Sequence, residues 1–340
     1  MFNIENFLQE RQQPSYRLQQ FNQHYYQQLI ESFDELTTWS KDLREQLKQE
    51  FSFSSLNLVK KQETKDQSTI KVLFALNRSP EDKLETVLMR HDDGRNTVCV
   101  SCMVGCPVGC TFCATGKMGL RTKLTGQEIV DQVLFFARWL KDKDEKITNV
   151  VYMGMGEPML NLDAIEGSID ILIDSEKMGL SQRRLTLSTA GFPEQIKKFV
   201  DDGYDQVKLA ISLHAPNQKL REKMMPIARQ FSLKELFAAL DYYQEKTNKL
   251  VSYEYILIKG LNDSPEHAQQ LADLLAGKLA HVNLIPFNPV PGTGYQRPKR
   301  QQVSQFSKLL TDAGISNSIR VTMGDEIDAA CGQLSSSENL

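Results

Sequence analysis

The chain of 340 residues lacks a long apolar run, a surplus of charge of one sign and any low-complexity segment. No stretch approaches the roughly 20 apolar residues that a membrane-spanning helix needs. The N-terminus also lacks the basic and apolar regions of a secretory signal, so we expect a cytoplasmic protein that makes no contact with a membrane. A net charge of −3 argues against a generally basic nucleic-acid-binding surface and leaves only local patches for such a contact.

The composition is that of a folded globular protein. Hydrophobic residues make up 41% and charged residues 24%, which excludes a disordered chain, a coiled coil and a collagen-like fibre. At roughly 100–200 residues per domain, the length predicts two domains, or one large domain with an appendage. We place the boundary near residue 90, with an accessory domain over 1–90 and a core with a C-terminal extension over 91–340.

The accessory domain is expected to be helical at first and then to form a β-hairpin. Residues 1–60 are polar, and apolar side chains recur there at every fourth position, which indicates the buried face of a helix. The apolar residues of this stripe are Phe21, Tyr25, Leu29 and Phe33. Two apolar segments joined by a turn, at 69–76 and 84–90, predict the two strands of the hairpin.

From about residue 95 the pattern predicts alternating strands and helices, which is typical of a parallel sheet or barrel. The expected strands are 97–104, 147–153, 184–189, 206–213, 252–258 and 280–286, with an additional strand at 318–323. The expected helices are 126–140, 163–175, 193–201, 233–245, 265–276 and 302–313. Six repeats indicate an α/β fold with a partial barrel, in which chemistry takes place at the C-terminal ends of the strands.

The cysteines depart from this ordinary picture. Five of the six lie within fifteen residues, and the sixth lies near the C-terminus: Cys99, Cys102, Cys106, Cys110, Cys113 and Cys331. A reducing compartment and a chain of this size disfavour a disulfide framework, so clustered thiols indicate metal or redox chemistry. Cys106, Cys110 and Cys113 follow the first core strand in a glycine-rich loop. Three such thiolates can hold an iron–sulfur cluster and leave one iron open for a substrate.

The spacing of the cysteines leaves two other readings open. Structural zinc needs a closed set of four ligands, and the pairs Cys99/Cys102 and Cys110/Cys113 would supply it. Only seven residues separate these pairs, whereas zinc sites usually have roughly 15–20 between them. The other reading is a set of redox-active or inert thiols.

Further candidate residues lie where later core strands end. They are Gly156, Glu157, Ser188, Ser212, Leu213, His214 and Asn288. A carboxylate beside glycine can accept an ammonium group from a ligand whose atoms approach the backbone closely. A single serine, histidine or asparagine at such a place is more often structural, and asparagine is common in turns. Their shared position at strand ends is therefore what makes these residues candidates.

Six longer strings resemble the RlmN/Cfr family of radical S-adenosylmethionine (SAM) RNA adenine methyltransferases. They are CVSCMVGCPVGCTFCATGKMGL, GMGEP, RRLTLSTAG, AISLHAPN, NLIPFNPVPG and GDEIDAACGQL, in this order along the chain. The resemblance extends from about residue 69 to 334. It implies a partial (βα)6 radical SAM barrel with a [4Fe–4S] cluster on Cys106, Cys110 and Cys113. It also implies that the strand-end residues bind SAM.

The resemblance implies a role for three residues outside the cluster motif. Cys331 would be methylated by one SAM molecule, and a second SAM would give a radical that removes hydrogen from this methyl group. The carbon radical would then add to C2 of adenosine in 23S rRNA, with tRNA as a further substrate. Cys99 would release the product by forming a disulfide with Cys331, and Glu85 would be the general base. Without the resemblance, Cys331 is read as a small buried apolar residue and Glu85 as an exposed strand residue.

The family also implies partners: RNA, and an electron donor such as flavodoxin or ferredoxin. We expect a monomer. Two segments without acidic residues, 114–123 and 289–311, are expected to contact RNA phosphates. The string NPVPG favours the C2 branch over the C8 branch of the Cfr type, which confers antibiotic resistance. Cys102 departs from the serine or threonine of relatives, which leaves two alternatives open: an inert thiol, or one that competes with Cys99 as the resolving thiol. A non-catalytic zinc or electron-transfer protein is the alternative of a different class.

Overall fold

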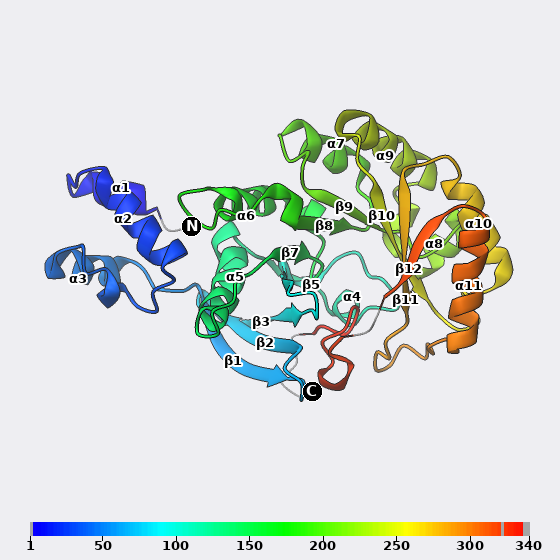
Figure 1. Ribbon diagram of the computed structural model, residues 1–340, viewed down its shortest axis with the longest axis horizontal. Helices are drawn as coiled ribbons and strands as arrows, with labels where there is room; N and C mark the ends of the chain where they lie inside the picture. Colours follow the sequence, from blue (N-terminus) through cyan, green and yellow to red (C-terminus); the bar gives the residue numbers. More distant parts are fainter. Residues whose placement is uncertain (1–2, 321–322, 336–340) are drawn as a thin grey trace.

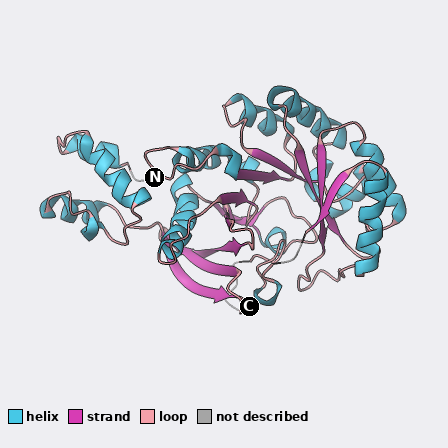
Figure 2. Ribbon diagram, in the orientation of Figure 1, coloured by secondary structure: helices cyan, strands magenta, loops and turns pink. Residues whose placement is uncertain are grey.

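A computed structural model describes residues 3–320 and 323–335 of the chain, and it is drawn in Figure 1. Within these ranges, one sheet of ten strands has the order β1-β2-β3-β4-β7-β8-β9-β10-β11-β12. From β4 to β12 in this order, each strand pairs in parallel with the next one, and helices cover the outer side of these strands (Figure 2). This arrangement confirms the predicted α/β fold with a partial barrel.

Except for the edge strand β12, which has no buried residue, the parallel strands carry many buried apolar residues because both faces of the sheet are covered. They are β4 (Asn96–Cys99), β7 (Asn149–Tyr152), β8 (Leu185–Thr189), β9 (Lys208–Ser212), β10 (Val251–Leu257), β11 (Ala280–Pro286) and β12 (Ser316–Ile319). The helices that alternate with them are α5 (Gly126–Lys141), α6 (Leu162–Ile173), α7 (Pro193–Asp201), α9 (Leu233–Thr247), α10 (Pro265–Leu275) and α11 (Arg300–Asp312). All six predicted helices are confirmed, and each end lies within two residues of its predicted position.

The N-terminal region contains one strand that we expected to be helical. Three helices, α1 (Ile4–Glu10), α2 (Tyr16–Asn22) and α3 (Lys41–Glu50), are followed by β1 (Leu56–Glu63). Strand β1 pairs antiparallel with β2 (Thr69–Leu76), which pairs with β3 (Ser79–Arg90), and β3 pairs with β4. The hairpin is therefore part of the barrel sheet. The predicted domain boundary coincides with the end of β3, and the division into two domains stays a prediction.

The predicted strand 97–104 is wrong in its extent, because two strands occupy this stretch. Strand β4 ends at Cys99, and β5 (Met103–Cys106) leaves the barrel to pair with β6 (Gly119–Lys123). The direction changes because the carbonyl of Met155 accepts the backbone N–H groups of Cys102 and Met103, at 2.9 and 3.1 Å. Of the strand predicted at 318–323, β12 ends at Ile319, and residues 321–322 lie outside the described residues.

The short elements complete the chain. They are the π-helical turn Gln23–Gln27, the 3₁₀ turns Phe33–Glu35, Pro158–Leu160, Gln182–Arg184, Pro226–Arg229 and Asp325–Ile327, and the helices α4 (Ala114–Met118) and α8 (Gln218–Met224). The sequence did not indicate α4 or α8, which are only one to two turns long. No helix within 3–320 or 323–335 has both the length and the apolar character needed to cross a bilayer.

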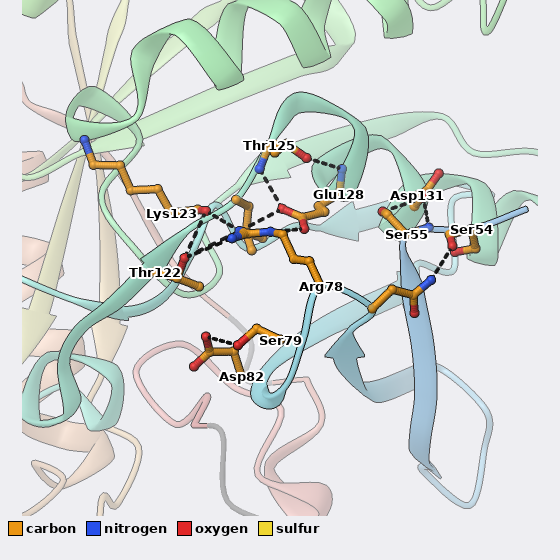
Figure 3. Close-up of polar contacts among 12 residues, drawn as sticks. Ser54, Ser55, Arg78, Ser79, Asp82, Thr122, Lys123, Thr125, Glu128 and Asp131 are labelled. Carbon is orange, nitrogen blue, oxygen red and sulfur yellow. Dashed lines mark hydrogen bonds and ion pairs between the residues drawn. The ribbon is translucent and has the colours of Figure 1, made fainter. Parts of the chain in front are cut away.

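Helix α5 connects the hairpin and the N-terminal helices to the barrel (Figure 3). The helix begins with a capping box, since Thr125 N donates to the Glu128 carboxylate at 2.7 Å and Glu128 N donates to Thr125 Oγ1. The same carboxylate binds Arg78, in the turn between β2 and β3, with Nε 2.7 Å from Oε1. One helical turn later, the buried carboxylate of Asp131 accepts both the N–H and the hydroxyl of Ser55, at 2.7 and 2.6 Å.

Candidate active site

Two adjoining cavities lie at the C-terminal ends of the parallel strands. The smaller one, about 160 Å³, is called the cluster cavity here, and its lining includes Cys106, Cys110, Cys113, Gly156, Glu157, Ser188, Ser212 and His214. The larger one, about 280 Å³, is called the strap cavity, and its lining includes His91, Cys99, Asn288, Met323 and Cys331. Cys113, Arg320 and Cys331 line both cavities.

The loop that carries the three clustered cysteines is held by backbone hydrogen bonds. Thr111 N donates to the carbonyl of Met224 at 2.9 Å, and Cys113 N donates to the carbonyl of Cys110 at 3.2 Å. Helix α4 packs so closely on this loop that a Cβ at Gly116 would lie 2.9 Å from the backbone of Cys110. The glycine is thus required for the close approach that shapes the loop.

The three thiols of this loop are free and face one cavity. Burial raises the pKa of Cys106 to about 12 and shifts the pKa of Cys110 and of Cys113 in the same direction. A bound metal must therefore displace their protons. Among the described residues, no three His, Cys, Asp or Glu side chains are arranged around a single ion. A [4Fe–4S] cluster does not need such convergence, because each thiolate binds a different iron.

Glu157 is buried beside the cluster cavity and is held by three hydrogen bonds. Its carboxylate accepts Thr189 Oγ1 at 2.6 Å, Ala190 N at 2.8 Å and Met159 N at 3.1 Å. Burial nevertheless raises the pKa of Glu157 to about 7. Gly156 before it has φ +107°, and a Cβ there would lie 2.7 Å from Met103 Cβ, so only glycine fits.

His214 is a neutral hydrogen-bonding residue in this wall. Its Nδ1 accepts the backbone N–H of Ile256 at 3.1 Å, so the ring proton lies on Nε2. Burial lowers the pKa of His214 to about 3, which keeps the ring uncharged at neutral pH. The backbone has φ +56°, and the carbonyl is held by Asn262 Nδ2 at 2.8 Å. Leu213 is fully buried, and its N–H donates to the carbonyl of Glu254.

The sequence did not lead us to predict two of the residues that line the cavities, Glu254 and Arg320. Glu254 on β10 is 4% exposed, and its Oε1 accepts Asn283 Nδ2 at 2.8 Å. Its Oε2 has no hydrogen-bond partner and lies 3.9 Å from Arg320 Nη1. A lone acid within the apolar run VSYEYIL was the available signal for Glu254. Arg320 follows β12, and nothing in its local sequence distinguishes it.

The C-terminal strap, defined as residues 323–335, brings Cys331 to the junction of the two cavities. Its position is fixed in part by Asn288, whose Nδ2 donates to the Cys331 carbonyl at 3.2 Å. Cys99 lines the strap cavity, and burial together with Cys331 raises the pKa of Cys99 to about 12. Cys102 is 3% exposed and lines neither cavity.

Glu85 is buried on β3, in contrast to the exposed position that its local sequence indicated. Its Oε1 lies 2.9 Å from Lys71 Nζ, and its Oε2 accepts the N–H of Ser335 at 2.7 Å. Burial raises the pKa of Glu85, and the Lys71 ammonium opposes this shift. Glu85 is not in the lining of either cavity.

Comparison with known proteins agrees with this architecture. A sequence model of the radical SAM superfamily matches residues 100–274, which include the three clustered thiols and most of the barrel. Fold and site thus define a radical SAM protein. A second model, described as the ribosomal RNA large subunit methyltransferase N-terminal domain, matches residues 2–52. The chain belongs to the RlmN family of this superfamily.

The relatives that establish the family match nearly the whole chain. A protein of Staphylococcus aureus, named a probable dual-specificity RNA methyltransferase RlmN, is 44% identical over 98% of this chain and 91% of its own. A second, RlmN 2 of Protochlamydia amoebophila, is 44% identical over 92% of this chain and 86% of its own. The crystal structure of a radical SAM methyltransferase from Sphaerobacter thermophilus superposes with a TM-score of 0.95 at 42% identity, covering 98% and 97% of the two chains.

The family implies a [4Fe–4S] cluster and SAM, and the residues of the cluster cavity fit both. Three thiols line one wall, as three thiolates of an open cluster require. Gly156 lies in the same lining, and its close packing on Met103 and Cys102 fixes the backbone at this edge of the cavity. The buried Glu254 Oε2, which lacks a hydrogen-bond donor, suits a ligand that carries hydroxyl or amino groups.

Proposed function

We propose that this protein methylates C2 of adenosine in 23S rRNA, with tRNA as a second substrate, through a methylated Cys331. One observation carries the proposal: Cys331 lines both cavities, between the three clustered thiols on one side and Cys99 on the other. A carrier of one carbon must reach the donor and the acceptor, and a residue at this junction can do so. The RNA methyltransferase names of the S. aureus and P. amoebophila relatives support the reaction class.

The cluster cavity would hold the cofactors. We assign Cys106, Cys110 and Cys113 to the cluster, which supplies the electron for reductive cleavage of SAM when both are bound. SAM would be bound by the strand-end residues Gly156, Glu157, Ser188, Ser212, Leu213 and His214, and by Asn288 from the adjoining strap cavity. Leu213 would contribute through its backbone or through packing, since its side chain is fully buried.

The strap cavity would hold the adenine base, which must leave its stack to be modified. The Cys331 sulfur would first take the methyl group of one SAM molecule, so that an S–C bond forms at Cys331, the S–CH3 bond of SAM breaks and the thiol proton is lost. One hydrogen of this methyl group would pass to the radical that a second SAM supplies, and the carbon would bond to C2 of the base, with one electron returned to the cluster and the C2 proton passed to the general base. The Cys99 thiolate would then attack the Cys331 sulfur, so that a disulfide forms, the bond between the Cys331 sulfur and the transferred carbon breaks, and this carbon takes up a proton as the methyl group of the freed RNA. Glu85 is the proposed base that accepts the proton from the ring carbon, and it must first exchange a present partner.

The assay is direct. Anaerobically reconstituted protein is incubated with SAM, a reductant and unmodified rRNA, and the nucleosides are analysed by mass spectrometry. We expect 2-methyladenosine from the wild type and none from Cys331→Ala. Full modification by Cys331→Ala would overturn the carrier role. Formation of 8-methyladenosine would instead establish the C8 branch, against which the NPVPG string argues.

The proposed partners are RNA and an electron donor such as flavodoxin or ferredoxin, with the protein acting as a monomer. The two basic segments meet, since Lys117 Nζ donates to the carbonyl of Pro291 at 3.2 Å. This contact supports the expectation that the two segments bind RNA phosphates together. A colourless preparation that contains zinc and no iron after anaerobic purification would favour the non-catalytic alternative over this proposal.

A further inference from the structure

The C-terminal strap is held on both sides of Cys331 by one buried ion pair that lies outside both cavities. Lys71 Nζ on β2 is 2.9 Å from Glu85 Oε1 on β3, and the two side chains are 2% and 4% exposed. Lys71 also donates to the carbonyl of Asp328 at 3.2 Å, while Glu85 Oε2 accepts the N–H of Ser335 at 2.7 Å. Cys331 lies between these two points of attachment.

Further contacts hold the part of the strap between these two points against the site. Ala114 N donates to the carbonyl of Gly332 at 2.8 Å, and Thr115 Oγ1 donates to the carbonyl of Leu334 at 2.7 Å. These donors come from α4, directly after the cluster loop. The ion pair acts from the opposite side, because β2 and β3 belong to the N-terminal hairpin, and Figure 1 shows the strap between this hairpin and α4.

Desolvation makes a buried ion pair a poor source of stability, since the attraction of the two charges is offset by the loss of their hydration. The Lys71–Glu85 pair instead gives the strap two directional contacts, one to a carbonyl and one to an amide. We propose that Lys71 is a positioning residue: through its ion pair with Glu85 it fixes the strap, and hence Cys331, at the junction of the two cavities. This inference rests on the proposed function of Cys331 as the methyl carrier.

The pair also connects the strap to the proposed base. While the strap is seated, the Ser335 amide occupies one oxygen of Glu85 and Lys71 occupies the other. Departure of Ser335 would free Oε2. Lys71 thus keeps Glu85 charged and oriented in the seated state, and the position of the strap determines whether the carboxylate can take a new partner.

Hydrogen exchange of the full chain with its reconstituted cluster tests the clamp without reference to turnover. Lys71→Met removes the ammonium and keeps an unbranched side chain. We expect amide exchange in residues 324–335 to accelerate by about tenfold or more, with β8–β10 unchanged. The matched control is Arg78→Met, which lies on the same hairpin as Lys71 and breaks the ion pair with Glu128 of α5 without touching the strap (Figure 3). It should leave exchange of the strap as in the wild type.

Lys71→Met leaves Glu85 as an uncompensated buried charge, which can unfold the protein. The double variant Lys71→Met/Glu85→Leu removes both charges and is expected to fold, again with faster exchange in the strap. Wild-type exchange in a folded double variant would overturn the clamp.

A second readout is the mass of the tryptic peptide that contains Cys331. Lys71→Met should lower the methylated fraction, with SAM affinity unchanged by equilibrium dialysis. If wild-type Cys331 is never methylated while Lys71→Met still loosens the strap, the carrier role fails and the clamp stands.

Discussion

At the scale of single residues, two cysteines that lie close together in the sequence differ in whether they line a cavity. Cys99 and Cys102 are three residues apart and both buried, yet only Cys99 lines the cavity that contains Cys331. The difference arises because β4 ends at Cys99 and the chain then turns towards Met155. The geometry therefore favours Cys99 as the resolving thiol, which the spacing of cysteines left open.

A pair of variants tests this assignment. Cys99→Ala should leave protein covalently joined to RNA through Cys331, because the other thiol that lines the strap cavity, Cys113, is assigned to the cluster and cannot attack the Cys331 sulfur. Cys102→Ala should turn over within about twofold of the wild type, since its sulfur faces neither cavity. Denaturing gels of labelled RNA detect the adduct. An adduct with Cys102→Ala and none with Cys99→Ala would reverse the assignment.

His214 gives a prediction of pH dependence. Its pKa is lowered to about 3 in the folded protein, so the unfolded chain binds the proton first as pH falls. The stability it contributes is fully present above its ordinary pKa of about 6.5 and is lost below it. His214→Asn keeps an acceptor for Ile256 N and tolerates φ +56°.

Urea titrations at pH 7.5 and 5.5 measure this effect. The wild type should lose about 1.4 kcal/mol more of its unfolding free energy than His214→Asn over this interval. An equal loss in both proteins would show that His214 takes up a proton in the folded protein as readily as in the unfolded chain.

At the scale of elements, local signals predicted what depends on local physics. The helices were predicted closely because apolar periodicity and capping residues such as Thr125 and Ser232 act within a few residues. Strand β1 was missed because it is an edge strand whose side chains are mostly exposed, so its sequence shows no alternation. Burial of Glu85 depends on Lys71 in the neighbouring strand, and this pairing follows from the β2–β3 register.

The same limit applies to the candidate site, where a local motif was predicted and a long-range pair of side chains was not. The cluster loop was visible because its three thiols are close in sequence. Glu254 and Arg320 became visible only when β10 and the end of β12 were brought together, since their ion pair spans two strands separated by β11. When the role of a side chain depends on a partner from a distant strand, a single sequence gives little sign of that role.

The β5–β6 hairpin offers a test of how the cluster loop is supported. Gly105 has φ +75°, and a Cβ there would lie 1.8 Å from the carbonyl oxygen of Gly119. Gly105→Ala should therefore force the hairpin apart, costing more than ~2 kcal/mol and lowering iron content after reconstitution. Gly94→Ala is the control, because Gly94 has φ +80° with nothing within 4 Å of the added Cβ. Iron bound by Gly105→Ala at the wild-type level would contradict this account.

At the scale of the whole molecule, the N-terminal helices lie beside the barrel and are attached to it through α5 (Figure 1). Asp131 accepts two hydrogen bonds from Ser55, and Arg138 Nε donates to the carbonyl of Ile30 at 2.8 Å. Residues 1–50 contain eight acids and five bases, so simple charge attraction to RNA does not explain this unit. The contacts that orient this unit on α5 say more about its role than its charge does.

Asp131→Ala should release this attachment. Loss of the carboxylate leaves the Ser55 donors unpaired, which costs about 2–3 kcal/mol and exposes the segment between α3 and β1 to protease. Limited proteolysis followed by mass spectrometry locates the cut. Asp273→Ala, which removes an exposed carboxylate on α10, should be cut as slowly as the wild type. Equal rates for both variants would place the attachment elsewhere.

The contacts of the strap also imply an order in which the parts of the site are made during protein synthesis. Lys71 and Glu85 are synthesised long before the groups that they bind, since Asp328 lies 257 residues after Lys71 and Ser335 lies 250 residues after Glu85. The strands of the barrel are therefore made before Cys331, the proposed methyl carrier. If the proposed function holds, a chain that stops before Cys331 would keep the three clustered thiols but would leave RNA unmodified.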